Sequence, residues 1–393
     1  MIIRRVFTLF AVLLVGLAIL EISFRLFVFP DWRTVSKVPF QKHAVYGTFQ
    51  KPNLEVRRYN PPNYDVVNRT NSRGFRDRES GFDADLNAIW IAGLSNSYGG
   101  YVEDAQTYAR LLEDKYGYRN ALLASEGHVL PNQVAVMRHL HAQGYRPSLV
   151  ILELTLNNVL RPYADGVREL AEPFYAPEIG EASQTRERAL PGLLARVWRI
   201  WTRLLSIDFI GIKARLINNS AVYAWAKVGV NASAALRQYT GRLGLRADPA
   251  VSDNIPVDML SAAGAKDDRL TEELADYVAG VGEWVEASLK AEFVVVLLPS
   301  PHHLNADWFD RYLASKGLGP ADLDPSRPYR LVRQALEDRN VPVLGMAEPL
   351  LSVGRFLNFP DDGHLNAAGH ARIARSLADW LKTRFGREPD LDP

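Results

Sequence analysis

Two parts of the chain alternate short apolar runs with longer segments in which apolar residues recur at helical spacing. The runs most typical of buried strands lie at 149–154 and 293–298, where β-branched residues are frequent. Weaker runs lie at 88–92, 121–124 and 341–344, and helical spacing occurs at about 105–116, 131–142, 271–290, 329–338 and 366–384. This alternation predicts an α/β domain, a three-layer α/β/α sandwich with a mostly parallel, flavodoxin-like sheet.

The N-terminal residues have a different pattern. Arg4 and Arg5 precede fifteen residues without a charge, and Glu21 and Arg25 interrupt the apolar sequence only near its end. A helix over 6–29 is long enough to cross a hydrocarbon layer of ~30 Å. Because no small-residue cleavage pattern follows, we expect an uncleaved N-terminal transmembrane helix with Arg4 and Arg5 on the cytoplasmic side. An amphipathic helix on the membrane surface and a buried helix of a soluble protein are the alternatives.

Domain organisation follows from these patterns. More than a hundred residues separate two predicted strands, which is too long for a bare loop, and they are expected to form a mainly helical insertion. Residues 193–205 within it have the pattern of an amphipathic helix, which is either a core helix or an element that lies on a membrane or covers a site. The expected units are a membrane anchor (1–30), a stalk with loops that lead into the main domain (31–86), the α/β domain (87–160 and 269–393) and the helical insertion (161–268).

Composition excludes several classes of function. Lys and Arg number 46 against 45 Asp and Glu, so the formal net charge of +1 gives no electrostatic basis for binding nucleic acid. The absence of Cys excludes disulfides, thiol catalysis and Cys-ligated metals. Metal-binding, P-loop and dinucleotide motifs are not found, and we therefore predict no metal site and no cofactor.

Candidate catalytic residues follow the predicted strands, where open α/β sheets place their ligands. Ser95 lies in the turn Gly-Leu-Ser-Asn-Ser-Tyr-Gly after the first strand, which would expose its hydroxyl, although such turns are also common without any function. Near the C-terminus, Asp361 lies three residues before His364. An Asp at this spacing orients a His as general base toward a serine nucleophile, with Asp362 as the competing carboxylate. The structural alternative is a helix N-cap beside a surface His.

Two further strand ends offer hydrogen-bond donors for a developing oxyanion. Gly127 follows the second strand, where its backbone N–H would be accessible, and Asn157 follows the strand at 149–154 with a neutral side-chain amide. A plain turn glycine and an Asx-turn residue are the alternative interpretations.

Together these residues resemble the SGNH (GDSL-like) hydrolase family, in which Ser, Gly, Asn and Asp-x-x-His follow successive strands in this order. The resemblance implies the SGNH hydrolase fold, the catalytic residues Ser95, Asp361 and His364, and an oxyanion hole formed by Ser95, Gly127 and Asn157. The segment 71–77, Asn-Ser-Arg-Gly-Phe-Arg-Asp, is similar to one that precedes the Ser turn in membrane-anchored bacterial members.

The sequence also departs from the family pattern. Leu94 replaces the usual Asp, the segment before Gly127 lacks its usual Asn, and Asn158 replaces another Asp. None of these changes removes a catalytic atom.

The function that we predict is a membrane-anchored, exported serine esterase or O-acyltransferase that forms an acyl-Ser95 intermediate. The resemblance implies acetyl esters of envelope or secreted glycans as substrates, and a bacterial inner-membrane protein whose domain faces the periplasm or the outside. Expected partners are an acylated small molecule or glycan, the membrane through the N-terminal helix and, as a further candidate, a membrane protein; nucleic acid is not expected. The alternative is a catalytically inactive assembly or glycan-binding component of a membrane complex.

The remaining histidines receive simpler interpretations. His128, His302 and His303 are expected near the active edge of the sheet, where they would line a pocket. His139, His141 and His370 fall on predicted helices and are expected at the surface.

Overall fold

The computed structural model describes most of the chain. Asn157, Asp361 and the predicted amphipathic helix at 193–205 lie outside the described residues. The residues that the structure describes are 2–33, 39–60, 63–79, 88–156, 216, 219–242, 257–261, 268–319, 323–360 and 362–386.

A five-stranded, fully parallel sheet forms the centre of the main domain, with the order β6-β5-β7-β8-β9. Its two long strands, β7 and β8, pair over seven residues and are almost entirely buried, as their continuous apolar sequences predict. The sheet confirms the predicted α/β class. Its strands are β5 (Ile89–Ala92), β6 (Asn120–Leu122), β7 (Leu149–Thr155), β8 (Glu292–Leu298) and β9 (Val343–Gly345).

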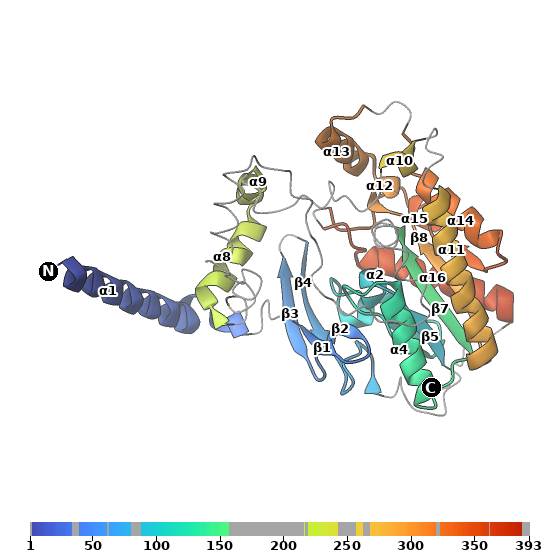
Figure 1. Cartoon of the computed structure of the whole chain (residues 1–393), viewed down its shortest axis with the longest axis horizontal. Helices are drawn as coiled ribbons and strands as arrows, with labels where there is room; N and C mark the ends of the chain where they lie inside the picture. Colours follow the sequence, from blue (N-terminus) through green and yellow to red (C-terminus); the bar gives the residue numbers. More distant parts are fainter. Residues whose placement is uncertain are drawn as a thin grey trace, which may run out of the picture.

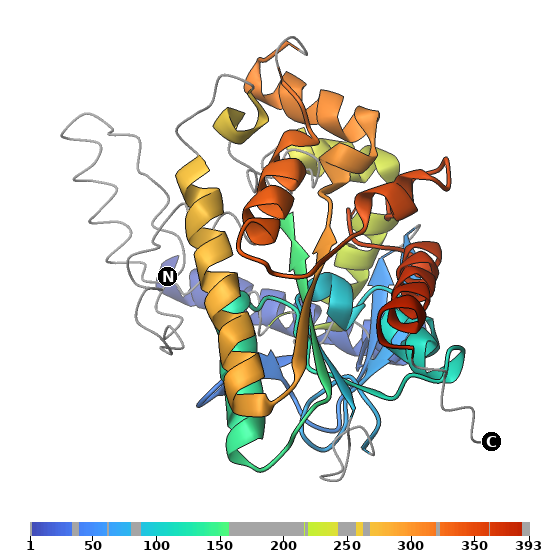
Figure 2. The same ribbon diagram turned by 90° about the vertical axis from the view of Figure 1, so that its right-hand side faces the viewer.

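Helices cover both faces of this sheet, which makes the three predicted layers (Figure 2). Alternate residues of each strand point to opposite faces, so Val150 and Leu152 enter one core cluster while Leu149 and Ile151 enter the other. The first cluster includes α4 (Leu130–Ala142), α11 (Asp268–Trp284), its π-helical continuation (Val285–Leu289) and α14 (Arg327–Glu337), and the second includes α3 (Tyr108–Asp114) and α16 (Ala367–Phe385). Shorter helices are α2 (Ser95–Tyr98), the 3-10 turn Asp104–Gln106, α12 (Pro301–Leu304), α13 (Ala306–Lys316) and α15 (Ala347–Leu351).

Two antiparallel hairpins precede the sheet, in the region where loops were expected. They pair β1 (Phe40–His43) with β2 (Gly47–Gln50), and β3 (Glu55–Asn60) with β4 (Tyr64–Arg69). The expectation of loops was wrong for 40–69 because these short strands mix Arg, Asn and Asp with apolar residues, which hides their alternation. Figure 1 shows the hairpins between the N-terminal helix and the parallel sheet.

The N-terminal helix α1 (Ile2–Ser23) continues into the π-helical turn Phe24–Val28 and the 3-10 turn Pro30–Arg33. The segment Phe7–Val28 has a mean hydropathy of 2.4 and no buried residue in its most apolar window. It is the one helix, within the part of the chain that the structure describes, that is long and apolar enough to span a membrane. In Figure 1, α1 projects away from the rest of the chain.

The described parts of the 161–268 segment are mainly helical, and one of them lies against the end of α1. Glu21 accepts hydrogen bonds from the Ser220 hydroxyl (2.9 Å) and the Ala221 backbone N–H (2.7 Å), so a residue of α1 caps the N-terminus of α8. The helices are α8 (Ala221–Ala232), α9 (Ala234–Arg242) and α10 (Val257–Leu260).

Candidate active site

Ser95 is the first residue of the short helix α2 and follows strand β5, the neighbour of the central strand β7, by three residues. The turn before it needs a glycine: a Cβ on Gly93 would lie 2.1 Å from Ser97 Oγ and 2.8 Å from Glu153 Oε2. The structure therefore explains the first glycine of the motif by close packing beneath the turn.

His364 connects Ser95 to a carboxylate. Its Nε2 lies 3.0 Å from Ser95 Oγ, and its Nδ1 forms a short hydrogen bond with Asp362 Oδ1. Because a carboxylate only accepts, the proton of a neutral imidazole lies on Nδ1, which leaves Nε2 free to accept the serine proton. Ser95, His364 and Asp362, which we call the triad, form the hydrogen-bonded chain that a serine nucleophile requires.

The carboxylate that holds His364 is Asp362, the competing candidate of the sequence analysis. Asp361, the first choice there, lies outside the described residues. Burial raises the pKa of Asp362, but hydrogen bonds with His364 and with the Tyr64 hydroxyl (3.4 Å from Oδ2) outweigh burial, and the pKa lies below its ordinary value. Asp362 is therefore ionised at neutral pH.

A second acidic group lies behind the imidazole. The Tyr101 ring stacks on His364, with 4.1 Å between centroids, and its hydroxyl donates to Glu126. Arg58 of β3 forms a bidentate ion pair with Glu126, at 2.5 and 3.1 Å. Burial raises the pKa of Glu126, but the charge of Arg58 outweighs it and keeps that pKa below its ordinary value. An ionised pair thus fixes the ring that supports His364.

On the opposite side, Glu153 of β7 lies directly under the serine turn and is only 1% exposed. It accepts hydrogen bonds from the backbone N–H groups of Leu94 (3.0 Å) and Ser97 (3.3 Å) and from the Ser97 hydroxyl (2.8 Å). The Thr155 hydroxyl donates to its other oxygen. Glu153 therefore holds the backbone on both sides of Ser95.

Asn96 joins the two sides of the site. Its side-chain amide donates to Thr155 Oγ1 (3.2 Å), and its oxygen accepts the backbone N–H of Leu365 at 3.2 Å. The residue after the nucleophile is thus bonded to the residue after His364, which fixes the distance between the two loops.

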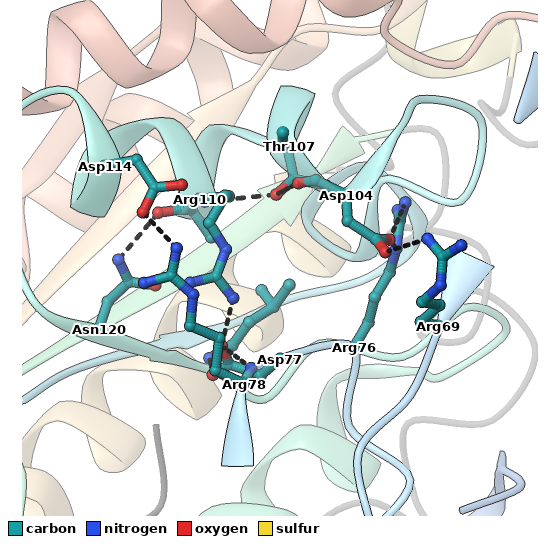
Figure 3. A pocket seen from close by; sticks show the side chains of 12 residues that line it. Arg69, Arg76, Asp77, Arg78, Asp104, Thr107, Arg110, Asp114 and Asn120 are labelled. Atoms are coloured by element: carbon teal, nitrogen blue, oxygen red, sulfur yellow. Dashed lines mark hydrogen bonds and ion pairs between the residues drawn. The ribbon is translucent and has the colours of Figure 1, made fainter. Parts of the chain in front are cut away.

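The segment that resembles the family motif at 71–77 fastens the loop that follows Ser95. The Arg76 guanidinium donates to the carbonyls of Tyr98 (2.9 Å), Gly99 and Val102 (2.7 Å) and pairs with Asp104 at 2.8 Å. Figure 3 shows Arg76 and Asp104 among the side chains that line a polar cavity of about 300 Å³.

Asp77 fixes the C-terminal end of the segment 71–77. It accepts the backbone N–H of Leu122 at 2.8 Å and pairs with Arg110 at 3.0 Å (Figure 3). Burial raises the pKa of Asp77 to about 6.

The two predicted oxyanion donors beyond Ser95 have different outcomes. Gly127 follows β6 in a turn, with a left-handed φ of 79° that favours glycine. Its neighbour Glu126 reaches the site through Tyr101. Asn157 lies outside the described residues, immediately after the last described residue of the β7 region. The role of both residues stays a prediction.

The histidine interpretations need one correction. His370 is buried rather than at the surface, because it lies on the face of α16 that packs against α3, where its Nδ1 accepts the Tyr108 backbone N–H at 3.2 Å. His139 and His141 are half-buried. The described residues contain no group of three or more His, Asp or Glu that could hold a metal.

Sequence reasoning missed five residues that surround the triad. Glu153 had a signal, since it is the only charge in an otherwise apolar strand. Tyr64 and Arg58 had none, because their strands were not recognised and their partners lie far along the chain. The other two missed residues are Tyr101 and Glu126.

Comparisons with known proteins give structural likenesses only. No protein-family model matches the sequence, and no curated protein does so either. Similar solved structures include the psychrotrophic esterase EstA from Pseudoalteromonas sp. (12% identity, 77% of this chain and 100% of that chain covered, TM-score 0.36) and TesA (13%, 75% and 98%, 0.34). A protein from Lactobacillus plantarum is also similar (11%, 76% and 97%, 0.34).

Proposed function

We propose that the protein is a membrane-anchored serine hydrolase or O-acyltransferase of the SGNH type, which acts on O-acyl esters through an acyl-Ser95 intermediate. One observation carries this proposal: the hydrogen-bonded chain from Ser95 Oγ through His364 to Asp362. A serine and a histidine that met by accident would not have a half-buried, ionised carboxylate aligned with the second ring nitrogen.

The reaction has two steps. Ser95 Oγ attacks the ester carbonyl while its proton passes to His364 Nε2, and the imidazolium is stabilised by Asp362 on Nδ1. His364 then gives this proton to the departing alcohol, and the acyl group remains on Ser95. Water resolves the acyl-enzyme in an esterase, and a sugar hydroxyl does so in a transferase.

The oxyanion of the tetrahedral intermediate needs donors on the other side of the carbonyl. The backbone N–H groups of Ser95 and Gly127 and the side chain of Asn157 are the proposed set. Glu153 supports this assignment, because it fixes the backbone of the Ser95 turn from β7. The Leu94 that departs from the family pattern is held through its backbone N–H, which any residue supplies.

The proposed location follows from the anchor. Arg4 and Arg5 stay on the cytoplasmic side, and the α/β domain is exported across a bacterial inner membrane. Acetyl esters of envelope or secreted glycans are the proposed substrates, and a membrane protein that presents them is a candidate partner.

The test is mass spectrometry of the full-length protein in detergent after incubation with p-nitrophenyl acetate and, separately, with a fluorophosphonate. We expect an adduct on Ser95 and release of p-nitrophenol, both lost in Ser95→Ala. Ser352→Ala, which removes an exposed serine after α15, is the matched control and keeps both. A folded wild-type protein that forms no adduct would contradict the enzyme and favour the alternative, an inactive assembly or glycan-binding component.

A further inference from the structure

An open cavity of about 410 Å³ lies beside the triad and is not used by the proposed chemistry. Tyr64 and Tyr101 line it, and both also contact the triad: Tyr64 donates to Asp362, and Tyr101 stacks on His364. A molecule bound in the cavity therefore touches the same two rings that support the catalytic groups.

The cavity is rich in aromatic rings. Phe356 and Phe359 line it with Tyr64 and Tyr101. The Tyr64 ring lies 5.1 Å from that of Tyr101 and 5.4 Å from that of Phe359, both edge to face. Phe356 is half-buried and touches Trp308, with 5.9 Å between ring centroids. Rings packed in this way present flat apolar surface that is held in place by its neighbours.

Polar side chains complete the lining. Asn63 and Gln106 contribute amides, and the exposed Arg355 contributes one cation. Arg355 forms no ion pair with another residue in the described part of the chain. The cavity thus combines flat apolar faces with donors and acceptors at their edges, and its charge is low.

We propose that this cavity is a sugar-binding subsite of the enzyme. A pyranose ring has apolar C–H faces, which fit against aromatic rings, and hydroxyls around its edge, which fit amide and guanidinium groups. An alkyl chain would pack on the rings but would offer the amide and guanidinium groups no hydrogen bond. The inference rests on the proposed function and deepens it: the subsite holds one ring of an oligosaccharide while a neighbouring ring presents its ester to Ser95.

The polar cavity of Figure 3 offers a contrast. Its arginines are already paired: Arg76 with Asp104, Arg110 with Asp77, and Arg78 with Asp114. Because these arginines already have carboxylate partners, the cavity gives no reason to propose an anionic ligand.

The experiment measures binding without chemistry. Full-length Ser95→Ala protein in detergent is titrated with two hexasaccharides, neutral cellohexaose and anionic hexamannuronate, by calorimetry. We expect at least one to bind, and Phe356→Leu, added to Ser95→Ala, to weaken it about ten-fold, because Leu keeps the apolar volume but not the flat face. Phe356→Tyr keeps the face and is expected to keep the affinity within about three-fold.

Tyr239→Ala provides the matched control, since it removes an exposed ring on α9 and is expected to leave binding unchanged. The inference is overturned if neither hexasaccharide binds, or if Phe356→Leu and Phe356→Tyr bind alike. The proposed function is tested separately. A wild-type protein that binds a hexasaccharide but never acylates Ser95 would support the subsite and contradict the proposed enzyme activity.

Discussion

The two sides of the candidate site differ in how they are built. The serine side comes from neighbouring parallel strands: Ser95 follows β5, and Glu153 and Thr155 lie on β7, both almost fully buried. All the hydrogen bonds described for Glu153 come from neutral donors. The histidine side draws on segments far apart in the sequence. Its two catalytic candidates are half-buried, with exposed side-chain fractions of 26% for His364 and 17% for Asp362.

This difference assigns a role to the N-terminal hairpin β3–β4. Arg58 and Tyr64 reach the histidine side from this hairpin, one through Glu126 and the other through Asp362. The serine turn, by contrast, is held by the sheet and by Asn96. We therefore expect that loss of serine-side bonds displaces Ser95, whereas loss of hairpin contacts weakens His364 as a general base.

The largest effect is expected where the histidine side carries the chemistry. Asp362→Asn keeps the shape but replaces a carboxylate, which can only accept, with an amide whose NH2 group can donate to His364 Nδ1 and favour the wrong tautomer. We therefore expect kcat/KM for p-nitrophenyl acetate to fall about 1,000-fold, or ~4 kcal/mol. Asp361→Asn is the matched control and is expected to stay within about three-fold. The reverse ranking would return the role to Asp361 and contradict the geometry.

Acid is expected to destabilise the fold by protonating the buried His128. Burial lowers the pKa of His128 to about 4, and its Nε2 is bonded to the Thr48 carbonyl at 2.7 Å. The unfolded chain binds a proton near pH 6.5 but the folded one only near pH 4, so stability is lost as the pH falls between these values, by about 3 kcal/mol in all.

Denaturant unfolding at a series of pH values measures this loss. His128→Gln keeps a donor for Thr48 without a titrating ring, and we expect its free energy of unfolding to fall less steeply between pH 6.5 and 4. Tyr239→Ala, which removes an exposed ring on α9 and no histidine, is the control and should leave the slope as in the wild type. Equal slopes for all three proteins would remove His128 from this account.

Glu153 tests whether the serine side acts through shape or through charge. Glu153→Leu leaves the N–H groups of Leu94 and Ser97 unpaired in the core, and we expect a loss of about 100-fold in kcat because Ser95 moves. Glu153→Gln still offers one acceptor oxygen and is expected to retain activity within about ten-fold. If Gln were as damaging as Leu in a protein that melts like the wild type, the negative charge rather than the backbone contact would be what Ser95 needs.

The same contrast explains how much of the molecule was predictable. Strands β7 and β8 were visible because both of their faces are buried, which makes the sequence continuously apolar. Ser95 and His364 were visible because each lies in a short local motif. The hairpin at 55–69 was missed because its apolar positions alternate with charged ones over only six residues in each strand. The choice of Asp362 needed the loop geometry. Asp361 and Asp362 are adjacent in the sequence, so their spacing from His364 alone does not decide which carboxylate contacts the imidazole.

The smallest effect should come from the most distant contact on the histidine side. The hydroxyl of Tyr64 lies 3.4 Å from Asp362 Oδ2, a long hydrogen bond between residues of the hairpin and of the C-terminal loop. Tyr64→Phe removes this bond while the ring still packs on Tyr101 and Phe359, and we expect kcat/KM to fall about three-fold. Tyr59→Phe, on strand β3 of the same hairpin, is the matched control and should change nothing. Equal small losses in both variants would mean that the hairpin acts only as packing, whereas a loss confined to Tyr64 would place it in the hydrogen-bonded chain that extends through Asp362 and His364 to Ser95.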